Sequence, residues 1–273
     1  MLLKLVVADN IAPFVDKIYQ DPSLYSWDTL ALASVAYAAQ IFCDFHGYTL
    51  MAIGLALCLG IRLPENFRMP YISRSLSEFW HRWHISLSSW LRDYLYIPLG
   101  GSRGTKWRTQ ANLLATMALG GLWHGASWTF LLWGCLHGAG LIAHKQWEAS
   151  PLAHLVARWP NWFVGSFSFL LTFLAVILLW IPFRSPDWKT MLLIFSRLFS
   201  GADGIRWWHT QSIILLTGLA LWHVLYGLRR SYVPYLMKYG NMKEIHGVLC
   251  FVAILVIVLF AAVHSSPFIY FQF

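Results

Sequence analysis

The triplet Trp123-His124-Gly125 lies within residues 109–144, a stretch that contains no Asp, Glu, Lys or Arg. An ionisable side chain is costly to place in such an apolar stretch of a membrane protein, so it is a candidate for function. Imidazole is also the side chain whose ordinary pKa lies nearest neutrality, which suits it to taking up and releasing protons. We therefore predict that His124 carries proton-transfer chemistry.

A second candidate region, residues 78–94, mixes large aromatic side chains with Arg, His, Glu and Asp and is too polar to span a membrane. Polar backbone is tolerated at membrane depth only where protein or a water-filled cavity covers it, which favours a re-entrant or interfacial helix. Arg74, Arg82 and Arg92 are predicted to bind the phosphates of a cytosolic cofactor, because guanidinium groups match phosphate geometry. The alternative is an aromatic-belt helix whose arginines reach lipid headgroups.

Other ligand-type residues give weaker signals. His81 and His84 are three residues apart, which on a helix would place both on one face, but no third or fourth ligand is near them in the sequence, so we predict no metal site. Asp44, in the run Cys43-Asp44-Phe45-His46, is expected to be structural and paired with an Arg or a His. A structural role is also expected for the other histidines in or beside apolar runs: His137, His144, His223 and His264.

The composition is that of a membrane protein. Apolar residues make up 58% of the chain, charged residues only 12%, and the mean hydropathy is +0.54. The four cysteines are scattered, without spacing suited to a disulfide framework or zinc. A net charge of +8 is explained by basic loops that flank a membrane, so we predict no nucleic-acid partner.

The apolar runs predict an all-α, polytopic membrane protein with five to seven membrane segments. A spanning helix needs about 20 apolar residues, and three uncharged runs meet that length: residues 159–183, 207–228 and 245–273. Residues 109–144 would extend roughly 54 Å as one helix, against a membrane core of about 30 Å. This run is therefore predicted to be a hairpin that turns near residues 125–127, with His124 at the break. Residues 29–61 are apolar except for Asp44.

We expect one domain over residues 1–273. Residues 1–28 read as an amphipathic lead-in whose surface helix ends before Asp21-Pro22, and residues 62–108 as a cytoplasmic or re-entrant region. With residues 62–108 inside, the inner loops hold fourteen basic residues and the outer loop, residues 184–206, holds four, as the positive-inside rule requires. Residues 188–195 are apolar enough to lie on the membrane surface.

Several motifs together resemble the membrane-bound O-acyltransferase family, and most of all its bacterial alginate O-acetyltransferase branch. The resemblance covers essentially the whole chain. The matching runs are residues 64–67, 70–71, 78–80, 82–88, 90–101, 120–126 and 266–273.

The resemblance implies an α-helical enzyme of the bacterial inner membrane that moves an acetyl group, with acetyl-CoA as donor, to a hydroxyl of an extracytoplasmic polysaccharide such as alginate. It implies that His124 is the general base in a tunnel through the membrane. It also implies that His84, the family's second histidine, orients the acyl carbonyl or relays a proton. Periplasmic acetyltransferase or acetyl-carrier proteins are the implied partners, and direct and relayed transfer are both compatible with these residues.

The sequence departs from the family pattern in two places. Family members usually carry more helices before the segment at residues 5–9, so this chain is expected to be short at its N-terminus. Leu50 stands where the branch often has Asp. Acylation of peptidoglycan, cellulose or teichoic acid stays open, as do an inactive fragment and a proton-coupled transporter using Asp44 and His124. Against a transporter, the sequence shows no inverted repeat.

Overall fold

A computed structural model describes the backbone of residues 1–239, 242–262 and 268, and the side chains of these residues outside 230–246. Its regular structure is helical, apart from one isolated β-bridge between Tyr25 and Ile205, which confirms the predicted all-α class. The chain divides into two compact units. Unit 1 comprises residues 1–63 and 198–272, and unit 2 comprises residues 64–197 and 273.

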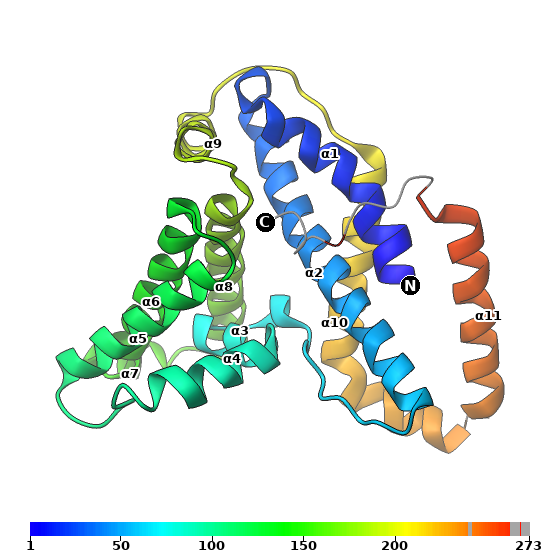
Figure 1. The fold of residues 1–273 in the computed structure, drawn as a ribbon. Helices are drawn as coiled ribbons and strands as arrows, with labels where there is room; N and C mark the ends of the chain where they lie inside the picture. The colour runs from blue at the N-terminus through cyan, green and yellow to red at the C-terminus, as the bar shows by residue number, and fades with distance from the viewer. Residues whose placement is uncertain (240–241, 263–267, 269–273) are drawn as a thin grey trace. The chain divides into compact units, whose positions relative to one another are not determined.

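Unit 1 is built on the long helix α2, along which α1 packs (Figure 1). One face of α1 is apolar and buried, with Ile11, Val15 and Ile18 fully covered, while Asp16 and Lys17 are exposed. This helix ends at Gln20, directly before Asp21-Pro22, as the sequence predicts. The helices of unit 1 are η1 (Leu3–Ala8), α1 (Asp9–Gln20), η2 (Pro22–Leu24), α2 (Trp27–Cys58), α10 (Thr210–Tyr239) and α11 (Met242–Phe260).

A buried ionic cluster joins the beginning of unit 1 to the middle of α2. The Lys4 Nζ lies 2.7 Å from Asp9 Oδ1 and 2.9 Å from Asp44 Oδ1. Gly47 allows this approach, because a Cβ at that position would lie 3.1 Å from the Lys4 backbone nitrogen. Asp44 is therefore paired, as predicted, but the partner expected, an Arg or a His, is wrong: Lys4 takes that place.

Unit 2 is organised around the antiparallel pair α5 and α6, which lie side by side, with α8 against α6 (Figure 1). Helix α5 ends at Trp123 and α6 begins at Trp128, which confirms the predicted hairpin and the break at His124. The helices are η3 (Pro70–Ile72), α3 (Leu76–Arg82), α4 (Ile85–Leu91), η4 (Arg92–Tyr96), α5 (Lys106–Trp123), α6 (Trp128–Glu148), α7 (Pro151–Val156), α8 (Asn161–Arg184) and α9 (Trp188–Ser200), whose last residues belong to unit 1.

Glycines let the backbones of α5 and α6 touch. A Cβ at Gly121 would lie 2.2 Å from the Phe130 carbonyl oxygen, and a Cβ at Gly134 would lie 2.2 Å from the Met117 carbonyl oxygen. Neither position has room for a side chain, so the helices approach as closely as main-chain atoms permit. This contact fixes the position of the turn that carries His124.

Within the part of the chain that the structure describes, three helices are long and apolar enough to cross a membrane: α2, α8 and the Thr210–Arg229 part of α10. They correspond to three of the predicted apolar segments. For the run at residues 245–273, the described part holds a shorter apolar helix, Gly247–Phe260, and part of the run, including His264, lies outside the described residues. The chain is thus a multi-pass membrane protein, and membrane crossing by α5 and α6 stays a prediction.

Helix α9 contains the segment predicted to lie on the membrane surface. The Asp187 carboxylate accepts the Thr190 backbone N–H at 2.7 Å, which begins the helix and lowers the pKa of that carboxyl. Met191 and Ile194 are buried, whereas Leu192 and Leu193 are exposed. The helix therefore presents apolar side chains on its exposed side, as the surface placement requires.

Candidate active site

His124 is the first residue after α5 and lies in a shell of aromatic rings. Its ring centroid is 5.1 Å from that of Phe183 on α8 and 5.3 Å from that of Trp133 on α6. The neighbouring Trp123 ring lies at 5.1 Å, and only 8% of the His124 surface is exposed. Such apolar surroundings disfavour the charged imidazolium, so His124 is held as a neutral imidazole.

His84 is held at the junction between α3 and α4 in a conformation that non-glycine residues seldom adopt. Its φ is 43° and its ψ is 55°, in the left-handed region, which costs about 1–3 kcal/mol for such a residue. The conformation is fixed from both sides. The Ile85 backbone N–H donates to the Asn66 carbonyl oxygen at 3.0 Å, and Arg68 donates to the Arg82 carbonyl oxygen at 2.9 Å. Strain maintained in this way is typical of functional positions.

The Asn66 side chain determines which nitrogen of His84 carries the proton. Its Oδ1 accepts the Ser86 backbone N–H at 3.1 Å and lies 3.3 Å from His84 Nδ1. Because the Ser86 N–H identifies this atom as the amide oxygen, His84 Nδ1 donates to it and Nε2 keeps the lone pair. Burial lowers the pKa of His84 to about 4, which keeps this imidazole neutral near pH 7.

The two histidines both lie close to the Trp123 ring. The ring centroid of Trp123 is 6.3 Å from that of His84 and 5.1 Å from that of His124. Trp83, the residue before His84, is 1% exposed and packs on Trp180 of α8 at 4.9 Å. The structure thus brings together, in unit 2, two neutral histidines that are 40 positions apart in the sequence.

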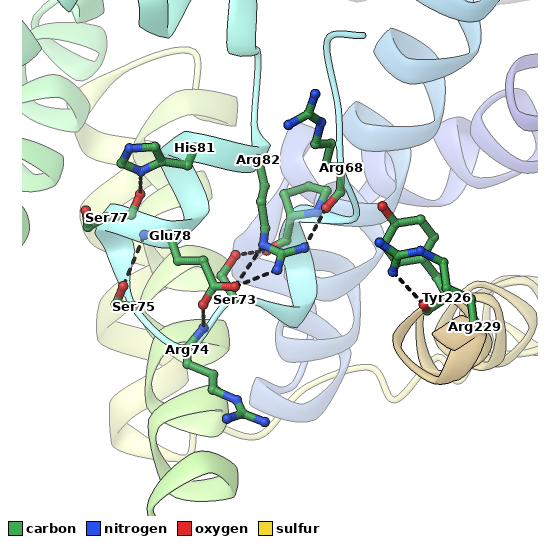
Figure 2. Close-up of polar contacts among 11 residues, drawn as sticks. Arg68, Ser73, Arg74, Ser75, Ser77, Glu78, His81, Arg82, Tyr226 and Arg229 are labelled. Carbon is green, nitrogen blue, oxygen red and sulfur yellow. Dashed lines mark hydrogen bonds and ion pairs between the residues drawn. The ribbon is translucent and has the colours of Figure 1, made fainter. Parts of the chain in front are cut away.

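Glu78 contacts two of the three arginines predicted to bind phosphates, Arg82 through its side chain and Arg74 through its backbone (Figure 2). The Arg82 Nε donates to Glu78 Oε1 at 2.9 Å, and Arg82 also donates to the Arg68 carbonyl oxygen at 2.9 Å. The Arg74 backbone N–H donates to Glu78 Oε2 at 2.8 Å. The guanidinium of Arg74 extends to α8, since a Cβ at Gly165 would lie 3.1 Å from it.

Arg92 lines a cavity of about 520 Å³ to which neither Arg74 nor Arg82 contributes. The Arg92 guanidinium is bidentate with Asp93, at 2.7 and 3.1 Å, and the pair raises the pKa of Arg92 and lowers that of Asp93. Basic side chains outnumber acidic ones around the cavity. Its polar and charged lining comprises Arg68, Ser77, His81, Ser88, Ser89, Arg92, Tyr96, Thr116, His144, Lys145 and Glu148.

His81 and His84 do not form the helical pair that the spacing suggested. Helix α3 ends at Arg82 and His84 is left-handed, so the two side chains do not share one helix face, which corrects that expectation. His81 Nδ1 lies 2.7 Å from the Ser77 carbonyl oxygen. Within the described ranges, no three His, Cys, Asp or Glu side chains gather as a metal site requires.

The sequence model of the membrane-bound O-acyltransferase family matches residues 1–180. This chain belongs to the membrane-bound O-acyltransferase family. Both histidines and the glycine contact between α5 and α6 fall within the matched residues. The family resemblance of the sequence motifs is thereby confirmed.

Membrane-bound O-acyltransferases similar to this chain act on several polymers, by their names. A probable alginate O-acetylase of Azotobacter vinelandii is 37% identical over 99% of this chain and 60% of its own length. A probable alginate O-acetylase of Pseudomonas aeruginosa is 44% identical over 72% of this chain and 36% of its own length. The peptidoglycan O-acetyltransferase of Helicobacter pylori is 37% identical over 76% of this chain and 38% of its own length. This chain therefore spans about 60% or less of these curated relatives.

Sequence reasoning missed Asn66, Trp133 and Phe183, which position or surround the two histidines. Asn66 lies 18 residues before His84, and Phe183 lies in a run that reads only as a membrane segment. Trp133 and His137 are one helical turn apart after the break. This spacing was the sequence signal that could have indicated a helix face next to His124.

Proposed function

We propose that this chain is a membrane O-acetyltransferase that moves an acetyl group from acetyl-CoA to hydroxyls of an extracytoplasmic polysaccharide such as alginate. The observation that carries the proposal is the pair of neutral histidines around Trp123, in a family of O-acyltransferases. The names of the alginate relatives favour this acceptor over the others.

His124 acts as the general base in this reaction. Its imidazole takes the proton from the attacking hydroxyl, whose oxygen forms a bond to the acetyl carbonyl carbon. Holding the hydroxyl and the acetyl group in one enclosed site replaces a bimolecular encounter. Of the two roles that the resemblance implies for His84, its Nε2 lone pair fits the relay of a proton, because an acceptor nitrogen cannot donate to the acyl carbonyl.

The cavity lined by Arg92 is the proposed entrance for the donor. Arg68, Arg92 and Lys145 line this cavity together with Glu148. Arg68 pairs with Glu65 and Arg92 with Asp93, so phosphates of acetyl-CoA would exchange with these carboxylates at exposed guanidinium groups. Of the three arginines predicted from the sequence, Arg92 is the one this proposal retains for the phosphates. The Arg82 guanidinium pairs with Glu78 within α3, and the Arg74 guanidinium lies against Gly165 of α8.

We propose the bacterial inner membrane as the location, with periplasmic acetyltransferase or acetyl-carrier proteins as partners. The three apolar helices and the bacterial relatives support that location. An acetyl group that reaches the far side of the membrane needs an acceptor or a carrier there. The charge bias of the loops supports the orientation that this route requires.

The test is complementation of bacterial cells that lack their own acetylase gene. The unmodified chain should restore acetyl esters on the surface polysaccharide, and His124→Ala, at equal membrane abundance, should lower them by about 10²-fold or more. Esters on peptidoglycan alone would change the acceptor. Equal ester content with both proteins would contradict the role of His124, and ion flux without esters would favour a transporter.

A further inference from the structure

Trp133 and His137, one turn apart on α6, carry ring nitrogens that are buried and lack a protein acceptor or donor among the described residues. The exposed fraction is 1% for Trp133 and 0% for His137. The atoms concerned are Trp133 Nε1 and His137 Nε2. Nearly all buried polar groups in folded proteins are hydrogen-bonded, so two neighbouring exceptions beside a candidate base require an explanation.

The hydrogen bond of His137 to Trp80 shows that its Nε2 is a donor. The Trp80 Nε1–H donates to His137 Nδ1 at 3.2 Å, so Nδ1 must hold the lone pair. A neutral imidazole then carries its proton on Nε2. An indole nitrogen can only donate, so Trp133 presents a second N–H of the same kind.

The Trp133 ring lies next to His124, and His137 lies next to Trp133. The ring of Trp133 packs edge-on against that of His124 at 5.3 Å and against that of His137 at 4.8 Å. Phe183 closes the group, 5.0 Å from Trp133 and 5.1 Å from His124. In these apolar surroundings a hydrogen bond from an N–H group to an oxygen is stronger than in water. The strengthening is largest when the oxygen carries negative charge.

We propose that the Trp133 and His137 N–H groups together bind the carbonyl oxygen of the acetyl donor and stabilise it as an oxyanion. The inference rests on the proposed acetyl transfer. As the acceptor oxygen bonds to the carbonyl carbon, the C=O electron pair moves onto the carbonyl oxygen, where the two N–H groups donate. When the C=O bond re-forms, the C–S bond breaks and the thiolate leaves with the proton that His124 has taken up.

Two substitutions of His137 separate this role from support of Trp80. His137→Asn keeps an acceptor near Nδ1 for Trp80 and removes the Nε2 donor, whereas His137→Gln keeps a donor near Nε2 and removes that acceptor. We expect kcat for acetyl transfer in membrane vesicles to fall about 10²-fold in His137→Asn and in Trp133→Phe, with little change in KM. His137→Gln should lose less than His137→Asn. The matched control Trp162→Phe alters an indole on α8 that is 73% exposed.

The opposite order, with His137→Gln the more damaging, would assign His137 to holding Trp80 and overturn the proposal. Unchanged kcat in His137→Asn and Trp133→Phe would also overturn it, since the donors would then serve a buried water or nothing.

A second measurement does not need turnover, so it separates this inference from the proposed function. Acetyl-CoA labelled with ¹³C at the carbonyl is added to the His124→Ala protein, and the carbonyl stretch is recorded by infrared spectroscopy. Two hydrogen bonds should lower the stretching frequency, and adding Trp133→Phe or His137→Asn should raise it again. A shifted band in a chain that makes no ester would support the donor site while the proposed function fails. A band at the solution frequency in every variant would overturn the inference.

Discussion

The two units treat their buried polar side chains in opposite ways. Unit 1 buries charges and pairs them, with Lys4 between Asp9 and Asp44. Unit 2, over its described residues, buries no Asp, Glu, Lys or Arg, and its buried polar groups are amides, hydroxyls and three imidazoles. A charge that is always paired stabilises a structure but cannot change state, whereas a neutral imidazole can take up a proton. Among the described residues unit 1 buries one imidazole, that of His223, and unit 2 buries three, which makes unit 2 the candidate for proton-transfer chemistry.

The largest expected effect comes from breaking the ionic cluster of unit 1. Lys4→Met leaves two buried carboxylates without their cation, which should lower the free energy of unfolding by about 3–5 kcal/mol. Thermal unfolding of the purified protein in detergent measures the loss. Lys189→Met, at an exposed lysine of α9, is the matched control. Equal stability of the two variants would show that the cluster does not stabilise unit 1.

Protonation of His84 in unit 2 is expected to have a smaller effect on the free energy of unfolding. His84 has a pKa of about 4 in the folded protein against an ordinary 6.5, so the unfolded chain binds this proton more readily. The contribution to stability is complete above about pH 6.5 and is lost as pH falls toward 4. At pH 5 the loss is about 2 kcal/mol relative to pH 8.

The measurement is the difference in unfolding free energy between pH 8 and pH 5 for the unmodified chain and for His84→Gln. The variant lacks the titrating group, so its difference should be smaller by roughly the stated amount, while contributions of histidines distant from residue 84 are the same in both proteins. An identical pH dependence in both proteins would mean that His84 is not held neutral by burial.

The smallest effect is expected at the partly exposed pair Arg82–Glu78 of unit 2. Arg82→Gln should cost less than about 1 kcal/mol, because solvent screens a pair of this exposure. Thermal unfolding at low salt and at high salt should give a difference that shrinks as salt rises. A loss as large as that of Lys4→Met would erase the distinction between the units.

The helices could be read from the sequence because membrane length and apolar runs determine them. The turn after Trp123 was predictable for the same reason: residues 109–144 are too long for one span and contain glycine at the break. His124 could be named from its place in the uncharged run, whereas a role for His84 came only from the resemblance of its motif to a family. Their spacing alone did not place them together.

The supporting contacts of the site were not predictable. Asn66 reaches His84 because residue 84 adopts a left-handed conformation, and nothing in the local sequence marks a histidine for that conformation. The sequence also did not indicate which of the three arginines lines a cavity. Arg82 forms an ion pair with Glu78, whereas Arg92 lines the cavity. The contact of Asn66 with His84 and the lining of the cavity depend on contacts between segments, whereas Glu78 and Arg82 form an i,i+4 pair within α3.

The backbone contact at Gly121 and Gly134 has a consequence for how this protein tolerates mutation. No side chain separates α5 from α6 there, so no rotamer or change of side-chain volume can alter their spacing. Substitutions on the outward faces of the two helices can therefore accumulate without moving His124 relative to Trp133. The hairpin therefore keeps the geometry of the candidate site constant, while the outward surfaces of its two helices can vary in sequence.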